Sequence, residues 1–334
     1  MRRLIWILVI LSILWCAWWA VLGFGVKSGI KAWFQDRRDL GWQAEYSRLD
    51  LQGFPVKVQA DVKDIALTDP ATDLTITLPL LTISAPAYWL GDITVDLPDD
   101  TITITTPERE MQINVQNGRA DLHLHPGTTL ELEQLLFVSD LWSSTTPAGT
   151  LYSGDDLTLS VKQSTDTPSR YNVLAQTNGF SPGNVARAKL QLPDSWPQTF
   201  KQLALDGSVT FSQPWDLASL KDQHPQPHHI KVNRAEIAWS DLRIFLAADL
   251  VVNTEGVPDG TVNIRADNWQ SALDLAQDAG LLTPAIYDQA QQVLAQLAQL
   301  SGDKDALDVQ LNFKAGFMAV GIIPIGPAPR LILP

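Results

Sequence analysis

From about residue 50 onward, apolar and polar side chains alternate along the chain with a period of two. Such alternation places apolar side chains on one face of a strand and polar side chains on the other. The clearest apolar series fall at 74–80, 93–97, 102–104, 111–115, 122–124, 157–161, 242–248, 262–264 and 307–313. Gly and Pro pairs with Asn, Asp or Leu separate these series as turns. The pattern predicts an antiparallel sheet with one apolar face.

One helical pair is expected to interrupt the strands in the C-terminal half. Asp267 or Asn268 can cap the first helix, and Gly280 supplies its stop. Thr283-Pro284 then gives a cap and an N1 proline for the second helix, which is expected to end at Ser301-Gly302. An apolar stripe at helical spacing predicts that this helix packs over an end of the sheet. The stripe comprises Ile286, Ala290, Val293, Leu294, Leu297 and Leu300.

The N-terminus carries a run of 21 residues, 4–24, without a charged side chain. A helix of about 20 apolar residues matches the roughly 30 Å hydrocarbon core of a bilayer. Arg2 and Arg3 precede the run and favour a cytoplasmic N-terminus, although basic residues also follow it. The run therefore predicts a single-pass anchor in the inner (cytoplasmic) membrane, with the bulk of the chain in the periplasm.

A cleaved signal peptide and a lipoprotein signal are two other possible uses of such a run. A cleaved signal peptide has a shorter apolar region and a small-x-small cleavage site, for which Gly23-Phe24-Gly25 is the one candidate. A lipoprotein signal needs a small residue before the acylated cysteine, but Trp15 precedes Cys16. A resident anchor is the preferred interpretation, and cleavage stays an alternative.

The predicted fold is mainly β with a minor α part. Residues 1–25 form a cytoplasmic tip and transmembrane anchor, and 26–49 form a membrane-proximal helical connector. Residues 50–334 form a large antiparallel sheet domain, curved or sandwich-like, with the helical pair inserted at about 268–301. Two or three helices cannot cover about a dozen strands with one apolar face, so the sheet has to bury that face by curling or by packing on itself.

Composition excludes several function classes. The net charge is −13 and most of the basic residues are scattered singly, which argues against nucleic acid as a partner. Cys16 is the only cysteine and lies in the apolar run. The exported domain therefore has no internal disulfide, thiolate nucleophile or cysteine metal site, and packing alone has to stabilise it.

The candidate catalytic and metal-binding groups are few. His123 and His125 lie two apart on a strand and are expected to face solvent; His224, His228 and His229 gather in an expected exposed loop at 223–229. Asp99-Asp100 and Asp155-Asp156 are acidic pairs at turns. The sequence has no Gly-x-Ser-x-Gly elbow, Rossmann fingerprint or His-Glu-x-x-His. We expect no enzymatic activity and assign no catalytic, cofactor-binding or metal-binding residue.

Five segments resemble an uncharacterised bacterial family catalogued as domain of unknown function 2125. They are 49–55 around Gly-Phe-Pro, 205–210, 255–260, 267–269 and the Gly- and Pro-rich tail 321–330. The family typically shows an Asp-Gly turn where this chain has Ala315-Gly316, and the alanine is expected to leave the hairpin intact. The family carries no established activity, so the resemblance implies location and architecture. In style it is distantly similar to AsmA-like envelope proteins associated with lipid transport.

Two functions from different classes are compatible with these features. The preferred hypothesis is a curved sheet that binds lipid or another apolar ligand in a groove, for envelope maintenance or lipid transport. The alternative is a structural or interaction module that offers its sheet edges or acidic face to another envelope protein. Alternation cannot distinguish an open groove from a sealed core; if a groove exists, its lining is expected from 74–80 and 242–248.

Overall fold

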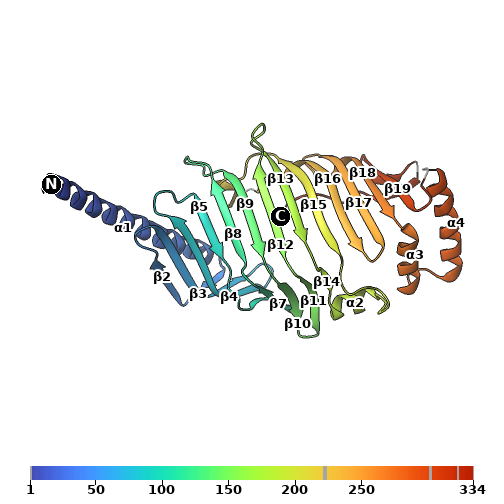
Figure 1. The fold of residues 1–334 in the computed structure, drawn as a ribbon, viewed down its shortest axis with the longest axis horizontal. Coiled ribbons are helices and arrows are strands. Elements are labelled where there is room, and N and C mark those ends of the chain that lie inside the picture. The colour runs from blue at the N-terminus through green and yellow to red at the C-terminus, as the bar shows by residue number, and fades with distance from the viewer. Residues whose placement is uncertain (1, 221–223, 301–302, 322, 334) are drawn as a thin grey trace. The chain divides into compact units, whose positions relative to one another are not determined.

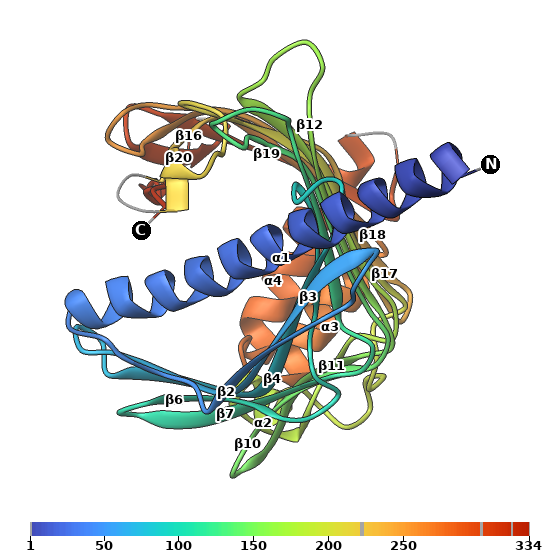
Figure 2. The same ribbon diagram turned by 90° about the vertical axis from the view of Figure 1, so that its left-hand side faces the viewer.

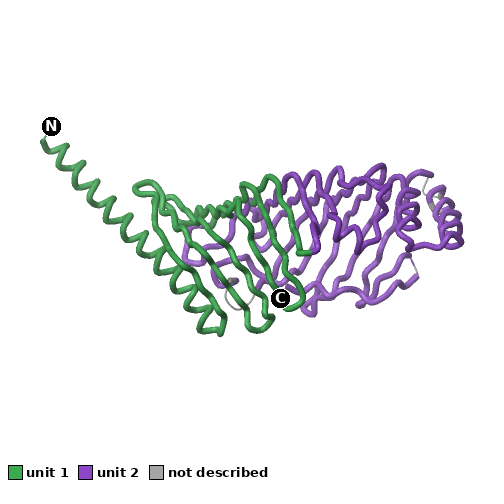
Figure 3. The backbone as a smooth tube through the Cα atoms, turned by 90° about the horizontal axis from the view of Figure 1, so that it is seen from below, with its two compact units in different colours: residues 1–124, 137–147 green, residues 125–136, 148–334 purple. Residues whose placement is uncertain are grey.

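The computed structural model describes residues 2–220, 224–300, 303–321 and 323–333 (Figure 1). The chain divides into two compact units, residues 1–124 with 137–147 and residues 125–136 with 148–334 (Figure 3). The strand pairings whose register the structure describes are antiparallel, and four α-helices accompany the strands. Among the described strands, no pairing closes a sheet into a barrel. The expected fold, mainly antiparallel β with a minor helical part, is confirmed.

The N-terminal helix is longer than the apolar run. The segments expected as anchor and connector form one continuous helix, α1 (Arg2–Asp39), of 38 residues (Figure 1). It ends at Asp39 rather than at residue 49, because Gly41 takes a φ of +88° and Gln43 already begins a strand. The expected helical connector is therefore correct for its first half only, and residues 43–49 belong to the sheet.

The sheet of the first unit is built around a long hairpin. Its strands are β1 (Gln43–Glu45), β2 (Arg48–Gln52), β3 (Lys57–Asp69), β4 (Leu74–Pro86), β5 (Asp92–Asp96), β6 (Ile102–Thr106), β7 (Arg109–Val115), β8 (Arg119–Leu124) and β10 (Trp142–Thr146). β3 pairs with β4 over 12 residue pairs and also carries β1 and β2. β4 carries β5 and β6 on its other edge. The hairpin of β3 and β4 is thus the frame of this unit.

The second unit has a sheet of long strands in sequence order. It contains β11 (Gly149–Gly154), β12 (Leu157–Gln163), β13 (Arg170–Thr177), β14 (Ser181–Pro182), β15 (Gln202–Phe211), β16 (Pro227–Trp239), β17 (Leu242–Val252), β18 (Pro258–Asp267), β19 (Ala306–Lys314), β20 (Phe317–Val320) and β21 (Ile323–Pro327). β9 (Leu132–Ser139) crosses the boundary between the units, and a short helix α2 (Asn184–Leu190) follows β14. β12, β13 and β15 to β19 pair successively.

The helical pair lies between β18 and β19, as expected, as α3 (Trp269–Asp278) and α4 (Pro284–Leu300). Asn268 occupies the cap position of α3, but its side chain donates to the Asp241 carbonyl instead of capping the helix. Gly280 takes a φ of +70° just after α3, and the Thr283 hydroxyl accepts from the amide of Ile286 at the start of α4. The predicted stop and second cap are therefore correct. The expected end at Ser301-Gly302 lies outside the described residues.

The expected apolar stripe of α4 is only partly correct. Ala290 and Leu294 pack with Trp269, Leu273 and Ala298 against the sheet. Ile286 and Val293 are 50% and 56% exposed, because the buried face of α4 is centred on Ala298 rather than on them. The Leu297 and Leu300 side chains lie outside the described part of the chain.

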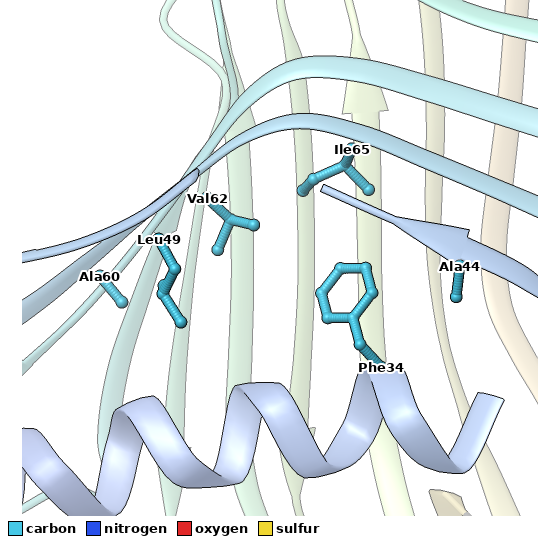
Figure 4. Close-up of a cluster of buried hydrophobic side chains, with 6 residues drawn as sticks. All are labelled: Phe34, Ala44, Leu49, Ala60, Val62 and Ile65. Carbon is cyan, nitrogen blue, oxygen red and sulfur yellow. The ribbon is translucent and has the colours of Figure 1, made fainter. Parts of the chain in front are cut away.

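A buried cluster fixes the C-terminal half of α1 to the first unit (Figure 4). Phe34 is 4% exposed and contacts the Tyr46 ring at a centroid distance of 4.7 Å. Its ring points from the helix toward the strands, where it meets the remaining members of the cluster: Ala44, Leu49, Ala60, Val62 and Ile65. This cluster makes α1 part of the sheet unit.

Replacing Phe34 by alanine is expected to lower the free energy of unfolding by about 3–5 kcal/mol, the typical cost of removing a buried phenyl ring. Equilibrium unfolding of the detergent-solubilised chain, followed by tryptophan fluorescence, measures the change. Gln35→Ala alters the neighbouring exposed position of α1 and is expected to stay within about 0.5 kcal/mol of the parent. Equal stability of the two variants would contradict this account.

Candidate functional site

Leu78 and Leu81 face the same side of the sheet although they are three residues apart in a strand. Opposite them, Val62 pairs with Leu81 and Ile65 pairs with Leu78. Between Val62 and Ile65, Asp64 takes a left-handed φ of 52°, and its carboxylate accepts from the Ser47 hydroxyl at 2.6 Å. A left-handed residue in a strand reverses the alternation of faces beyond it. Consequently the apolar series on both sides of Asp64 face α1.

A groove of about 330 Å³ lies between this side of the sheet and α1. All nine lining residues are apolar: Ile30, Trp33 and Phe34 from α1, Val62, Ile65 and Leu67 from β3, and Leu78, Leu81 and Ile83 from β4. Trp33 is 44% exposed, so the groove is open to its surroundings along the helix. A volume of this size is at the lower end of small-molecule sites, and an apolar lining selects an apolar occupant.

Of the expected lining from 74–80, only Leu78 lines the groove; Leu74, Ile76 and Leu80 do not, and Leu80 pairs with the exposed Lys63. Leu81 and Ile83 take its place because of the reversal at Asp64. The helix residues of the lining were not predicted. Their signal in the sequence is the helical spacing of Val26, Ile30 and Phe34 beyond the apolar run.

The second unit carries an apolar face that crosses seven strands. One row of paired residues consists of Leu159, Ala175, Leu205, Ala235, Leu246, Ile264 and Val309. The neighbouring row consists of Val161, Val173, Gly207, Val232, Ala248, Val262 and Leu311. We call these two rows the apolar face. Figure 2 shows these strands as a curved layer with α3 and α4 on its inner side.

The two rows of the apolar face differ in burial: Gly207, Ala248 and Val262 of the second row are buried, whereas the first row is only partly covered. At one flank, α3 and α4 pack against Ala266 and Leu307; at the other, Met318 and Ala328 pack near Leu250. Between these flanks no residue of the first row is buried, and Leu205 is 36% exposed. Leucine and isoleucine in the middle of a seven-stranded sheet are normally buried by a second layer. Leu246 and Ala248, which were expected to line a groove at 242–248, belong to this face.

The opposite face of the same strands is polar and charged. Glu236, with a side chain only 8% exposed, accepts from Arg234 at 2.7 Å and from Arg243 at 2.8 Å. Both guanidinium groups also lie over the Phe245 ring. Arg265 bonds Asp267 at 2.8 Å, which with Asp308 and Asp303 holds the pKa of that guanidinium above its ordinary value. These paired charges identify this side as the solvated one.

The five histidines each have a separate local partner. His123 bonds Asp92 at 3.0 Å and is exposed as expected, whereas His125 bonds Gln163 at 2.7 Å. His224 contacts the Ser219 carbonyl, His228 the Val252 carbonyl and His229 the Asp249 carboxylate.

The loop expected at 223–229 is wrong in its second half, because β16 begins at Pro227 and turns His228 and His229 to opposite faces. Gln223, the first residue of that expected loop, lies outside the described residues. No group of three or more His, Cys, Asp or Glu side chains in the described part of the chain is placed to hold a metal ion.

The acidic pairs act as turn residues. Asp99 accepts from the amide of Asn117 and Asp100 from that of Thr101, both at 2.7 Å. Asp156 accepts from the amide and side chain of Asn178. Ala315 and Gly316 form a two-residue turn with φ of 50° and 81° between β19 and β20, so the hairpin is intact as expected.

Two groups with a shifted pKa hold one loop of the second unit. Burial raises the pKa of Tyr171, whose phenol oxygen accepts from the Trp215 amide at 3.0 Å. Hydrogen bonds from the amide and hydroxyl of Ser219 lower the pKa of Asp216. Both arrangements satisfy local donors and acceptors around residues 212–220.

Fold and site together define a mainly antiparallel β protein with exposed apolar surfaces and an N-terminal helix that is long and apolar enough to cross a membrane. The chain belongs to the bacterial family described as "Uncharacterized protein conserved in bacteria (DUF2125)", whose model matches residues 19–329. The resemblance inferred from the sequence segments is thereby confirmed. No curated protein and no solved structure matches the chain.

Replacing Asp64 by valine is expected to lower the free energy of unfolding by about 1–2 kcal/mol, because a β-branched residue strongly disfavours the left-handed conformation. Chemical denaturation of the purified chain measures the loss. Asp64→Asn is the matched control: asparagine adopts this conformation readily and can still accept from Ser47. If both substitutions cost the same, the reversal of faces does not depend on the backbone conformation at this residue.

Proposed function

We propose that this chain is a non-enzymatic, inner-membrane-anchored periplasmic protein that binds acyl chains of lipids in the groove between α1 and the β3–β4 hairpin. The observation that carries the proposal is the composition of the groove, whose nine lining residues are all apolar. A ligand that fits there gains about 0.8 kcal/mol for each methylene group removed from water. An acyl chain offers such groups in a row and needs no hydrogen-bond partner.

The position of the groove along α1 supports a lipid as the ligand. The apolar run ends at Phe24, and the first lining residue, Ile30, follows six residues later in the same helix. Six residues of α-helix span about 9 Å, at a rise of about 1.5 Å per residue. A groove so close to the end of a membrane span has the highest concentration of apolar chains in the cell beside it.

The apolar face of the second unit supports the same class of ligand independently. Its first row consists of aliphatic side chains that are only partly buried, with Leu205 36% exposed. Contiguous apolar surface of this kind marks a binding site for an apolar partner. Within the second unit we propose that lipid chains or another apolar ligand cover it; a segment of another envelope protein is the alternative occupant.

Net charge bears on the partners as well. The net charge is −13, and Arg234, Arg243 and Arg265 of the second unit are paired to carboxylates, so the described strands of that unit do not favour nucleic acid as a partner. Recognition through acyl chains is consistent with this charge distribution.

The groove is tested by filling it. Leu78→Trp places an indole among the lining residues; excluding about two methylene groups costs about 1.6 kcal/mol, a loss of affinity of ~15-fold. Mass spectrometry of phospholipids that co-purify with the detergent-extracted chain is expected to show a corresponding loss. Leu80→Trp, on the same strand but outside the groove, is the control and is expected to retain lipid. Equal lipid content of the parent and both variants would refute binding in the groove.

Topology is tested with fusions and intact mass. Alkaline phosphatase fused after Pro334 is expected to be active, since it folds only in an oxidising compartment, and the chain is expected to remain in the membrane fraction after an alkaline wash. Intact mass is expected to include residues 1–25. An inactive fusion would contradict the periplasmic location, and a mature chain beginning near Gly25 would contradict the resident anchor.

A further inference from the structure

Three tryptophans on one side of α1 donate hydrogen bonds to the first sheet unit. The indole N–H of Trp15 donates to the Pro55 carbonyl at 3.0 Å, that of Trp18 to the Ala87 carbonyl at 3.0 Å, and that of Trp19 to the Lys57 carbonyl at 2.9 Å. The Trp19 ring also packs edge-on against Phe54, with centroids 5.4 Å apart. Two turns of the sheet, at residues 53–57 and 86–89, are thereby held against the middle of the apolar run. We call these two turns the sheet tip.

The depth of this contact follows from helix geometry. Trp15 lies nine residues before Phe24, the last residue of the apolar run, which is about 14 Å along a helix that rises about 1.5 Å per residue. The hydrocarbon core is roughly 30 Å thick. A span that fills this core therefore carries the sheet tip well into the leaflet on the side of the sheet.

The composition of the sheet tip fits that location. Phe54, Val56 and Tyr88 are 54%, 69% and 71% exposed. No charged side chain occurs at 53–56 or at 85–91. In water these exposed apolar side chains would be unfavourable, whereas in a leaflet they are solvated by acyl chains. Lys57, at the edge of the tip, has a long side chain that can extend toward the headgroups.

Backbone polarity is the main obstacle to placing a turn in hydrocarbon, because an unpaired carbonyl there costs several kcal/mol. The three indole bonds remove that obstacle for the carbonyls of Pro55, Lys57 and Ala87. Within the turns, the Gly53 carbonyl accepts from the amides of Val56 and Lys57, and the Val56 carbonyl accepts from the amide of Ala87. These bonds satisfy much of the backbone of the tip, so its exposed surface is mainly that of side chains.

We propose that the sheet tip is a membrane-insertion element, whose Phe54, Val56 and Tyr88 side chains enter the acyl region of the leaflet beside α1. The bilayer then contacts the protein through the tip as well as through the helix. This proposal rests on α1 being a membrane span, but it does not require a lipid in the groove.

Depth-dependent quenching tests the insertion. In a Cys16→Ser background, which removes the only cysteine, the full chain carries Val56→Cys labelled with an environment-sensitive fluorophore. It is reconstituted in vesicles of phosphatidylethanolamine and phosphatidylglycerol. Ala71→Cys is the matched control, because it lies in the turn at the other end of the same hairpin, about 40 Å away for a 13-residue strand. Tyr88→Cys gives a second site in the tip.

Labels at Val56 and Tyr88 are expected to be quenched several-fold more by phospholipid carrying a doxyl group on its acyl chain than the label at Ala71. Aqueous iodide is expected to give the reverse order. Quenching of the tip labels by iodide but not by doxyl lipid would overturn the proposal. So would protection from both quenchers, which would show that another protein covers the tip. Leu78→Trp, which fills the groove, is expected to leave the quenching unchanged, so failure of groove binding and failure of insertion are distinguishable.

Discussion

The first unit depends on one helix face that packs along the β3 side of the sheet for much of its length. This face begins with Trp15 and Trp19, continues through Gly23 and ends at Phe34. Gly23 is buried, and an added Cβ would lie 3.5 Å from Leu51, so the helix approaches β2 closely at that point. Because positions four apart lie on one side of a helix, the apolar run and the sheet contact share a single continuous surface. The orientation of the sheet unit relative to α1 is thus determined by packing and not by a flexible linker.

The second constraint is the imbalance between apolar sheet surface and material to cover it. In the second unit, helices and C-terminal strands cover the flanks of the apolar face, and the described chain leaves the row from Leu159 to Val309 only partly buried. The sheet remains stable with this row partly uncovered because long antiparallel ladders satisfy its backbone hydrogen-bonding groups. Ion pairs around Glu236 stabilise its opposite face. The remaining cost is apolar area in water, at about 25 cal/mol for each Å². Any apolar occupant recovers that free energy on binding.

Sequence reasoning found the class of fold and missed the features that shape the site. Period-two alternation identifies strands because it follows from backbone geometry alone, and the run at 4–24 identifies a span from its length. It does not reveal a local reversal such as that at Asp64, which depends on a single left-handed residue opposite Pro79. The helical connector was expected to reach residue 49, whereas α1 ends at Asp39 and the chain from Gln43 pairs with β3, a contact that Phe34 stabilises. Long-range packing, invisible in one segment of sequence, decided both points.

The tryptophans of α1 show how the same residues support two interpretations. Placement toward one end of an apolar run is typical of an aromatic belt at the membrane interface. In the structure each of the three indoles has a carbonyl of the sheet as its partner, so the polar edge of the ring is satisfied by protein instead of by headgroups or water. An indole with its N–H paired is no longer confined to the interface, and the carbonyl that it pairs is no longer excluded from hydrocarbon. Because each indole N–H is paired with a carbonyl of the turns, the helix and the turns can lie together at a depth in the bilayer that neither would favour alone.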